Sequence, residues 1–234
     1  MTAKDVIKDL NLYVDKKKAE LLSKFFKTGK GEYGEGDIFI GIVVPSQRII
    51  AKKHKDLPLL EVQKLLNSKI HEYRLTALLL LTYKFQKADE KTKNAIIKFY
   101  LKNTKYINSW DLVDLSASYI LGKYLFNRPE KEILYKFSRS NNLWERRIAI
   151  ISTFEFIKNK QFTDTLRIAE ILLRDKEDLI QKTVGWMLRE VGKRNLKAEE
   201  QFLKKYYQYM PRTMLRYAIE KFPEEKRQFY LLKK

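Results

Sequence analysis

The sequence predicts an all-α protein built as a helical-repeat solenoid, and three observations lead to this fold class. Most of the 234 residues lie in segments whose apolar side chains recur at the spacing of one helix face. Only 8 Gly and 5 Pro interrupt these segments. Three similar phrases, H-E-Y-R-L-T-A-L-L-L-L, L-W-E-R-R-I-A-I-I-S-T and L-I-Q-K-T-V-G-W-M-L-R, resemble the second helices of successive helical pairs.

The spacing of one cation in each phrase suggests the repeat length. Arg146 lies 72 residues after Arg74 and 36 residues before Lys182, so a period of 36 places Trp110 in the slot between Arg74 and Arg146. Lys and Arg are common in this chain, and an irregular helical bundle is therefore the alternative. Because each repeat buries its apolar face only against its neighbours, we expect residues 1–234 to form a single domain.

The predicted helices follow one another with short breaks. In chain order they span residues 57–67, 73–86, 90–102, 110–126, 130–138, 144–158, 162–173, 179–192 and 198–209. Turn-forming sequences such as N-R-P, S-R-S-N-N and R-D-K-E-D separate the later helices. A glycine-rich stretch, Gly29 to Asp37, breaks the N-terminal portion and lacks the G-K-[ST] of a P-loop.

The composition restricts the partners and the chemistry. The chain has 48 Lys and Arg against 29 Asp and Glu, and a formal charge of +19 attracts polyanions, nucleic acid first and an anionic membrane second. With no Cys, and with only His54 and His71, we expect no disulfide, no metal site and no cofactor. No segment reads as a signal peptide, a membrane span or a basic amphipathic anchor, so we expect a cytoplasmic monomer that does not bind membranes.

The sequence W-D-L-V-D contains an acidic residue in an unusual place. In a helix, Trp110 and Asp114 lie four positions apart and share one face, so the predicted carboxylate is buried beside an indole in an apolar run. A buried carboxylate needs a paired charge or a chemical purpose, and an ion pair with an Arg of a neighbouring repeat is the structural alternative. Asp111 is expected to serve the helix N-terminus, where a negative charge meets the helix dipole.

A second group of residues combines cations with an indole. Lys182, Trp186 and Arg189 lie at i, i+4 and i+7, which places the indole between two cations on one helix face. Cations suit phosphates and indoles suit bases. Alternatively, the cations are solvated charges and Trp186 is a packing residue. Further cations at helical positions are Arg146, Arg147, Arg212 and Arg216. The first two could instead pair with Glu145 or Asp178.

Four motifs together resemble the AlkD-type DNA alkylation repair family over roughly residues 27–222. They are E-Y-G-E-G-D-I-F-I-G-I-V-V-P-S-Q-R at 32–48, W-D-L-V-D at 110–114, L-W-E-R-R-I-A-I at 143–150 and I-Q-K-T-V-G-W-M-L-R-E at 180–190. Members of this family are HEAT-like helical solenoids that release alkylated purines from duplex DNA as DNA glycosylases. The resemblance thus implies a HEAT-like solenoid with a concave basic face, and double-stranded DNA containing alkylated bases as the partner.

The resemblance also assigns roles to single residues. The family's key indole falls on Trp110, its essential carboxylate on Asp114 and its second indole on Trp186, and these three are the predicted catalytic residues. The phosphate-gripping arginine of W-x-x-R falls on Arg147. The further predicted DNA-binding residues are Arg48, Arg146, Lys182, Arg189 and Arg216. This chain departs from some relatives at Val43, where they have a polar residue.

The implied function is hydrolysis of the N-glycosidic bond of cationic alkylated purines, 3-methyladenine and 7-methylguanine, in base excision repair. The alternative is a non-catalytic HEAT-like module that binds nucleic acid or serves as a protein scaffold. Such a module would use the same cations but has no need of Asp114 beside an indole.

Overall fold

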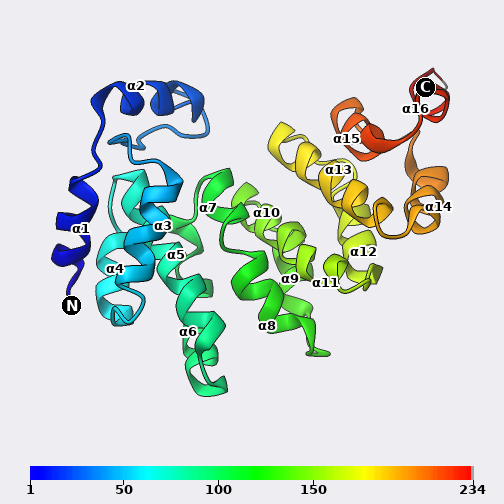
Figure 1. The fold of residues 1–234 in the computed structure, drawn as a ribbon. Helices are drawn as coiled ribbons and strands as arrows, with labels where there is room; N and C mark the ends of the chain where they lie inside the picture. Colours follow the sequence, from blue (N-terminus) through cyan, green and yellow to red (C-terminus); the bar gives the residue numbers. More distant parts are fainter. Residues whose placement is uncertain (233–234) are drawn as a thin grey trace. The chain divides into compact units, whose positions relative to one another are not determined.

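The computed structural model describes residues 1–232, and they are organised as short helices joined by turns (Figure 1). Within this range there is no strand, and extended pairing is limited to a single parallel bridge between Ile38 and Ile70. No helix in the described range combines the length and apolar character needed to cross a membrane. The all-α class predicted from apolar periodicity is therefore confirmed.

The contacts divide the chain into two compact units, residues 1–116 and 117–234. The single domain over residues 1–234 stays a prediction. The first unit contains α1 (Ala3–Asn11), α2 (Lys16–Phe25), α3 (Val44–Lys53), α4 (Leu59–Leu66), α5 (His71–Lys87), α6 (Glu90–Lys102), the 3₁₀ turn η1 (Thr104–Tyr106) and α7 (Trp110–Asp114).

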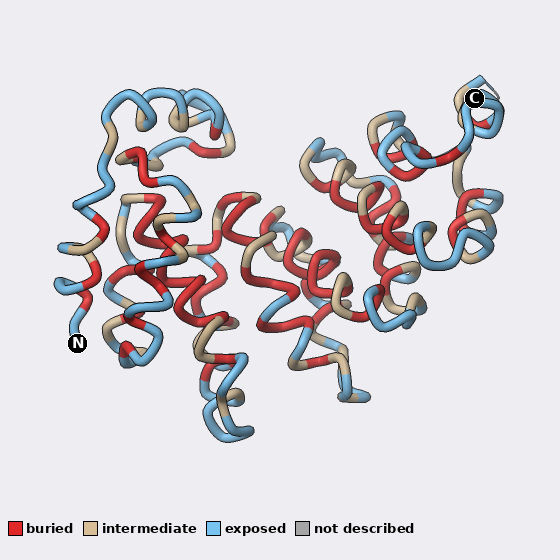
Figure 2. The backbone as a smooth tube through the Cα atoms, in the orientation of Figure 1, coloured by how far each residue is buried: buried red, intermediate tan, exposed pale blue. Residues whose placement is uncertain are grey.

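The core of the first unit is built around α5, which contacts α3, α4, α6 and α7. Leu75 and Leu78 to Leu81 are almost completely inaccessible, and Figure 2 shows buried positions along much of this helix. A helix covered on all sides explains the continuous apolar run L-T-A-L-L-L-L. By contrast, α2 contains no buried residue.

The second unit contains η2 (Ser118–Gly122), α8 (Lys123–Phe126), α9 (Glu132–Ser138), α10 (Leu143–Ser152), α11 (Phe154–Lys158), α12 (Thr163–Ile171), α13 (Asp178–Gly192), α14 (Leu196–Tyr206), α15 (Arg212–Ala218), η3 (Ile219–Lys221) and α16 (Glu224–Leu232). Its central helix is α13, which packs against α10, α14 and α15. A Cβ atom at Gly185 would lie 2.4 Å from the carbonyl oxygen of Met214, so glycine permits the close approach of α13 and α15.

Two helices predicted as continuous are broken in the structure. The predicted helix 110–126 consists of α7, a turn, the π-helical η2 and α8, and the predicted helix 144–158 divides into α10 and α11. At each break a serine hydroxyl donates to the carbonyl four residues earlier, from Ser116 to Leu112 at 2.6 Å and from Ser152 to Ile148 at 2.7 Å. Such side-chain hydrogen bonds compete with the backbone hydrogen bonds of the helix and favour a bend.

The helical repeat is present, but its equivalent positions differ from the predicted ones. Arg74 and Arg146 are both the fourth residue of their helices, α5 and α10. The fourth residue of α13 is Gln181, so the predicted equivalence of Lys182 is wrong by one position. Trp110 is the first residue of α7 and therefore does not occupy the slot of Arg74 either. The helices α5, α7, α10 and α13 begin 39, 33 and 35 residues apart. The repeat therefore has no exact period, and a fixed spacing of 36 residues cannot align its equivalent positions.

The N-terminal motif is held against the start of α5 by one carboxylate. Glu72 Oε1 accepts the backbone N–H groups of Ile40, Gly41 and Ile42 at 3.0, 2.8 and 3.3 Å. Gly41 has φ +85°, and a Cβ there would lie 2.0 Å from the carbonyl oxygen of Asp15. Glycine at this position thus serves both the left-handed backbone and the close packing against the start of α2.

Candidate functional site

Trp110 and Asp114 are the first and last residues of α7, one helical turn apart. Their side chains therefore leave the helix on the same side, as the spacing predicts. Both residues are half-buried. The expectation of a buried Asp114 is wrong, because the residue ends a five-residue helix and is half-buried there rather than enclosed inside a longer helix.

The Trp110 indole is held by aromatic side chains from the N-terminal segment. It stacks on Phe26, with ring centroids 5.0 Å apart and planes at 7°, and Phe25 meets it edge-on at 5.9 Å. Its Nε1–H donates to the Tyr33 hydroxyl at 3.2 Å. Because Phe26 covers one face of the indole, a ligand can reach only the opposite face or the edge.

The ring contacts continue from Phe26 into the interior of the first unit. Phe26 stacks on Phe39 at 4.8 Å, and Phe39 stacks on His71 at 4.5 Å. His71 is the first residue of α5. A continuous row of rings thus connects Trp110 with the start of the central helix.

His71 belongs to a buried group of four charged residues, called here the charged quartet: Asp37, His71, Arg74 and Asp111. His71 Nδ1 lies 3.0 Å from Asp37 Oδ2 and Nε2 lies 2.8 Å from Asp111 Oδ2. Arg74 Nη2 donates to the same Asp37 oxygen at 2.6 Å. Burial alone would lower the pKa of His71, but the bonds to Asp111 and Asp37 outweigh it and raise the pKa from 6.5 to about 8.

The charged quartet corrects two expectations from sequence. Asp111 lies in the first turn of α7, as predicted, but its side chain binds His71 rather than serving only the helix terminus. His71, which sequence places outside every motif, touches the W-D-L-V-D motif in space. The sequence feature that could have indicated a role for His71 is H-E-Y-R, which places three polar residues among four just before the apolar run of α5.

Within residues 1–232 no group of three or more His, Asp or Glu side chains is arranged to hold a metal ion.

In the second unit, Trp186 is half-buried on α13, and its ring lies 6.0 Å from that of Phe154. The two cations that share its face are both ion-paired within the chain. Lys182 Nζ lies 2.6 Å from Asp178 Oδ2, and Arg189 pairs with Glu220. The indole is thus flanked by cations as predicted, but each of them already has a carboxylate partner.

Arg146 and Arg147 have different surroundings although they are adjacent. Arg146 holds Asp175 through Nε at 2.6 Å and Nη2 at 3.3 Å, and not Glu145 or Asp178. Arg147 is 5% exposed, and its Nη1 donates to the Leu179 carbonyl at 2.9 Å and to the Thr183 hydroxyl. Both guanidinium groups therefore help to build the second unit.

The remaining predicted cations are more accessible. Arg48 is half-buried on α3, and Arg216 is exposed on α15. Neither forms an ion pair within the part of the chain that the structure describes. Val43 is 40% exposed and precedes α3 without capping it through a side-chain hydrogen bond.

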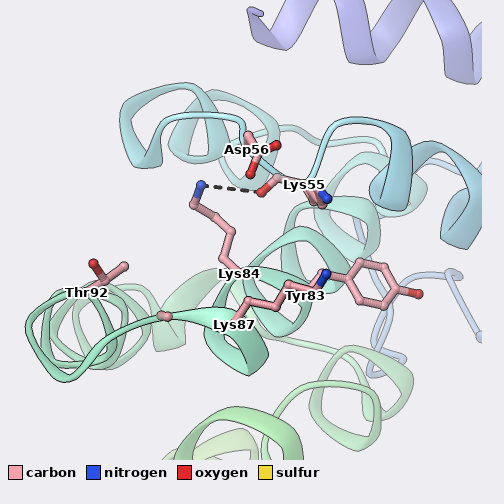
Figure 3. Close-up of a pocket in the computed structure, with 7 residues that line it drawn as sticks. Lys55, Asp56, Tyr83, Lys84, Lys87 and Thr92 are labelled. Carbon is pink, nitrogen blue, oxygen red and sulfur yellow. Dashed lines mark hydrogen bonds between the residues drawn. The ribbon is translucent and has the colours of Figure 1, made fainter.

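A lysine-rich surface lies at the other end of α5, beside the turn that follows α3, and two adjoining cavities of about 230 and 340 Å³ open there. Figure 3 shows the residues that line the first of these cavities. The two cavities share the lining residues Lys55, Tyr83 and Lys87. Figure 3 shows the Lys84 ammonium group directed at the Lys55 carbonyl, 3.4 Å away. From His71 to Lys87 the helix extends roughly 24 Å at 1.5 Å per residue. This surface is therefore separate from Trp110, and positive charge is not confined to one place.

The fold and these residues define a class of protein: an all-α helical-repeat protein with a half-buried indole and carboxylate on one short helix. The sequence profile of the family described as DNA alkylation repair enzyme matches residues 6–222, and the chain belongs to this family.

A solved structure, described as a predicted DNA alkylation repair enzyme from Enterococcus faecalis, shares the fold. The TM-score is 0.72 at 19% sequence identity, covering 90% of this chain and 97% of that chain. A search of curated proteins finds no match.

Proposed function

We propose that this member of the DNA alkylation repair family is a monofunctional DNA glycosylase. It hydrolyses the N-glycosidic bond of cationic alkylated purines, 3-methyladenine and 7-methylguanine, in duplex DNA and so begins base excision repair. The observation that carries the proposal is the half-buried Asp114 carboxylate, one turn from an indole that aromatic side chains hold in place. A module that only binds DNA has no use for this pair.

The chemistry follows from the charge of the lesion. A purine alkylated at adenine N3 or guanine N7 is cationic, so it leaves without a general acid. The sugar then becomes an oxocarbenium-like cation, which the Asp114 carboxylate stabilises while it orients the attacking water. The accessible face of Trp110, and Trp186, add cation–π attraction of about 0.5–2 kcal/mol each. We place no general acid in this mechanism.

The DNA-binding residues are proposed in three groups. Arg48 and Arg216 are accessible and unpaired in the described part of the chain, so they contact phosphates directly. Arg147 alone forms the second group: we propose that it holds the phosphate beside the lesion, although its side chain is buried and its Nη1 also donates to Leu179 and Thr183. Arg146, Lys182 and Arg189 are already paired with carboxylates, so a phosphate must compete with those partners and gains less affinity from them.

We further propose that the whole chain acts as one monomeric, cytoplasmic domain with a concave basic face. The formal charge of +19 supports the basic character of this face, because it draws the duplex to the protein at long range.

A duplex with one radiolabelled 7-methylguanine tests the proposal. We expect free 7-methylguanine in the presence of protein, above its spontaneous release from the same duplex without protein. Tight binding without release would instead identify a non-catalytic DNA-binding module, and neither binding nor release would point to a protein scaffold.

A further inference from the structure

His71, the first residue of α5, belongs to none of the motifs and has no role in the proposed chemistry. Both of its ring nitrogens face carboxylate oxygens, at 3.0 Å toward Asp37 and 2.8 Å toward Asp111. A neutral imidazole has one N–H donor and one lone pair, so it can satisfy only one of two carboxylates. Only the imidazolium donates to both. The geometry therefore selects the protonated ring.

The surroundings of His71 make a buried cation acceptable. The quartet contains two cations and two carboxylates, so its formal charge is zero while His71 is protonated, and its side chains are between 2% and 9% exposed. Arg74 opposes the imidazolium charge, and the two carboxylates favour it. The neighbouring Glu72 directs Oε1 to backbone N–H groups of the Ile40–Ile42 segment instead.

Solvent reaches the edge of the quartet. Asp37 and Arg74 line a cavity of about 250 Å³ together with Glu35, Lys69 and Lys105. Protons can therefore exchange with water without unfolding of the first unit. Loss of the His71 proton would leave the quartet with a net negative charge, and one carboxylate would face a nitrogen lone pair.

Two routes connect His71 to Trp110. Asp111 follows Trp110 in the first turn of α7, so the His71–Asp111 bond ties that turn to the start of α5. The row of rings through Phe39 and Phe26 is the second route. Because α7 has five residues and no side-chain N-cap bond, it cannot be stable alone and needs such a tie.

We infer that His71 is a positioning residue: bridging Asp37 and Asp111, its imidazolium holds the first turn of α7 and thereby the orientation of the Trp110 indole. Asp114 ends the same short helix, so the His71–Asp111 bond holds both of the proposed catalytic residues that lie on α7. The catalytic consequence rests on the proposed function, whereas the orientation of Trp110 does not.

The orientation of Trp110 can be tested by its fluorescence in a Trp144→Phe/Trp186→Phe variant, in which Trp110 is the single tryptophan. We expect emission and acrylamide quenching to change with an apparent pKa near 8, the value raised by the two carboxylates. His71→Gln should abolish this titration. His54→Gln is the matched control, since His54 is also buried but contacts one carboxylate, Asp9, at 2.6 Å. The titration should survive in this control.

Asp111→Asn gives a second readout if His71→Gln does not fold. Removing one carboxylate removes a cause of the raised pKa, so the fluorescence midpoint should move to lower pH. An unchanged midpoint in Asp111→Asn, or an unchanged titration in His71→Gln, would overturn the inference.

Activity assays in the native tryptophan background separate this inference from the proposed function. In single-turnover release of 7-methylguanine, His71→Gln should lower the rate at least roughly tenfold, while duplex affinity changes by less than about threefold, because misplaced catalytic groups affect mainly the chemical step. An equal loss of affinity and rate would refute a positioning role. If the wild type released no base but the fluorescence titration behaved as expected, the proposed function would fail and the positioning role would stand.

Discussion

Arg74 and Arg146 lie 72 residues apart, and each donates to the backbone carbonyls of the residues six and five positions before it. Arg74 Nη1 donates to the carbonyls of Ser68 and Lys69 at 3.1 and 3.3 Å, and Arg146 Nη1 to those of Ser140 and Asn141 at 3.0 and 3.1 Å. The repeated unit is therefore a guanidinium clamp that closes the turn before a long helix.

This clamp predicts that Arg146 contributes more to stability than to DNA binding. Arg146→Ala removes the guanidinium partner of Asp175 and the side-chain donor of two carbonyls, so we expect a loss of about 1–3 kcal/mol in the free energy of unfolding, measured with urea. Arg216→Ala is the matched control, and its exposed side chain should change stability by less than about 0.5 kcal/mol. Equal effects of the two substitutions would contradict a clamp.

The salt dependence of duplex binding should identify the phosphate contacts. Arg147→Ala and Arg216→Ala should each reduce the log–log slope of affinity against salt by roughly one, since each contact releases a condensed counterion. Lys87→Ala, on the lysine-rich surface at the far end of α5, should leave the slope unchanged. If Lys87→Ala had the same effect as the arginine substitutions, binding would depend on total charge and not on these residues.

The buried Glu199 should make stability depend on pH. Burial, aided by the charge of Glu200, raises the pKa of Glu199 from 4.5 to about 8, against a smaller opposing effect of Arg189. The folded chain thus keeps a proton that the unfolded chain releases, so the free energy of unfolding falls as pH rises from 4.5 to 8. His71, whose pKa is raised from 6.5 to about 8, contributes stability that is full below pH 6.5 and lost as pH rises through 8.

Glu199→Gln removes the pH dependence of stability that comes from Glu199 and leaves the part that comes from His71. We expect thermal unfolding to depend less on pH between 5 and 8 than in the wild type, with a stabilisation on the order of a few kcal/mol at pH 8. Glu225→Gln, at an exposed position of α16, should behave as the wild type. Parallel pH profiles for the wild type and Glu199→Gln would show that Glu199 ionises normally.

The proposed mechanism also predicts the choice of substrate. With a cationic leaving group and no general acid, 3-methyladenine and 7-methylguanine should be released, while uracil and hypoxanthine should not. Chromatography of the bases released from duplexes with one modified base each would measure this. Efficient release of uracil would reveal a proton donor and show that charge on the base does not select the substrate.

The sequence predicts the helices well because their signal is local. Apolar periodicity over residues 90–102 matches α6, and the spacing of Trp110 and Asp114 places both on one side of α7. The helix breaks at Ser116 and Thr153 were not predicted, because periodicity registers apolar faces and not hydroxyl groups that bond back to the helix.

The environment of Trp110 could not be predicted in the same way. Phe26, Tyr33, Phe39 and His71 come from segments 39 to 84 residues away in sequence, and only packing brings them together. The roles proposed for Trp110 and Asp114 rest on a family resemblance. The match of the family profile over residues 6–222 confirms the family membership, and the roles stay a prediction.

The central claim is that the Asp114 carboxylate performs catalysis and is not merely structural. The most direct measurement is the single-turnover rate of 7-methylguanine release by Asp114→Asn, with Asp56→Asn as a control that makes the same charge change on the lysine-rich surface. We expect Asp114→Asn to remain folded and to bind the duplex within a few-fold of the wild type. Its release rate should fall by about a hundredfold or more, since a lost electrostatic contact in the transition state costs about 3 kcal/mol. Asp56→Asn should retain the wild-type rate. Near-normal release by folded Asp114→Asn would contradict the account.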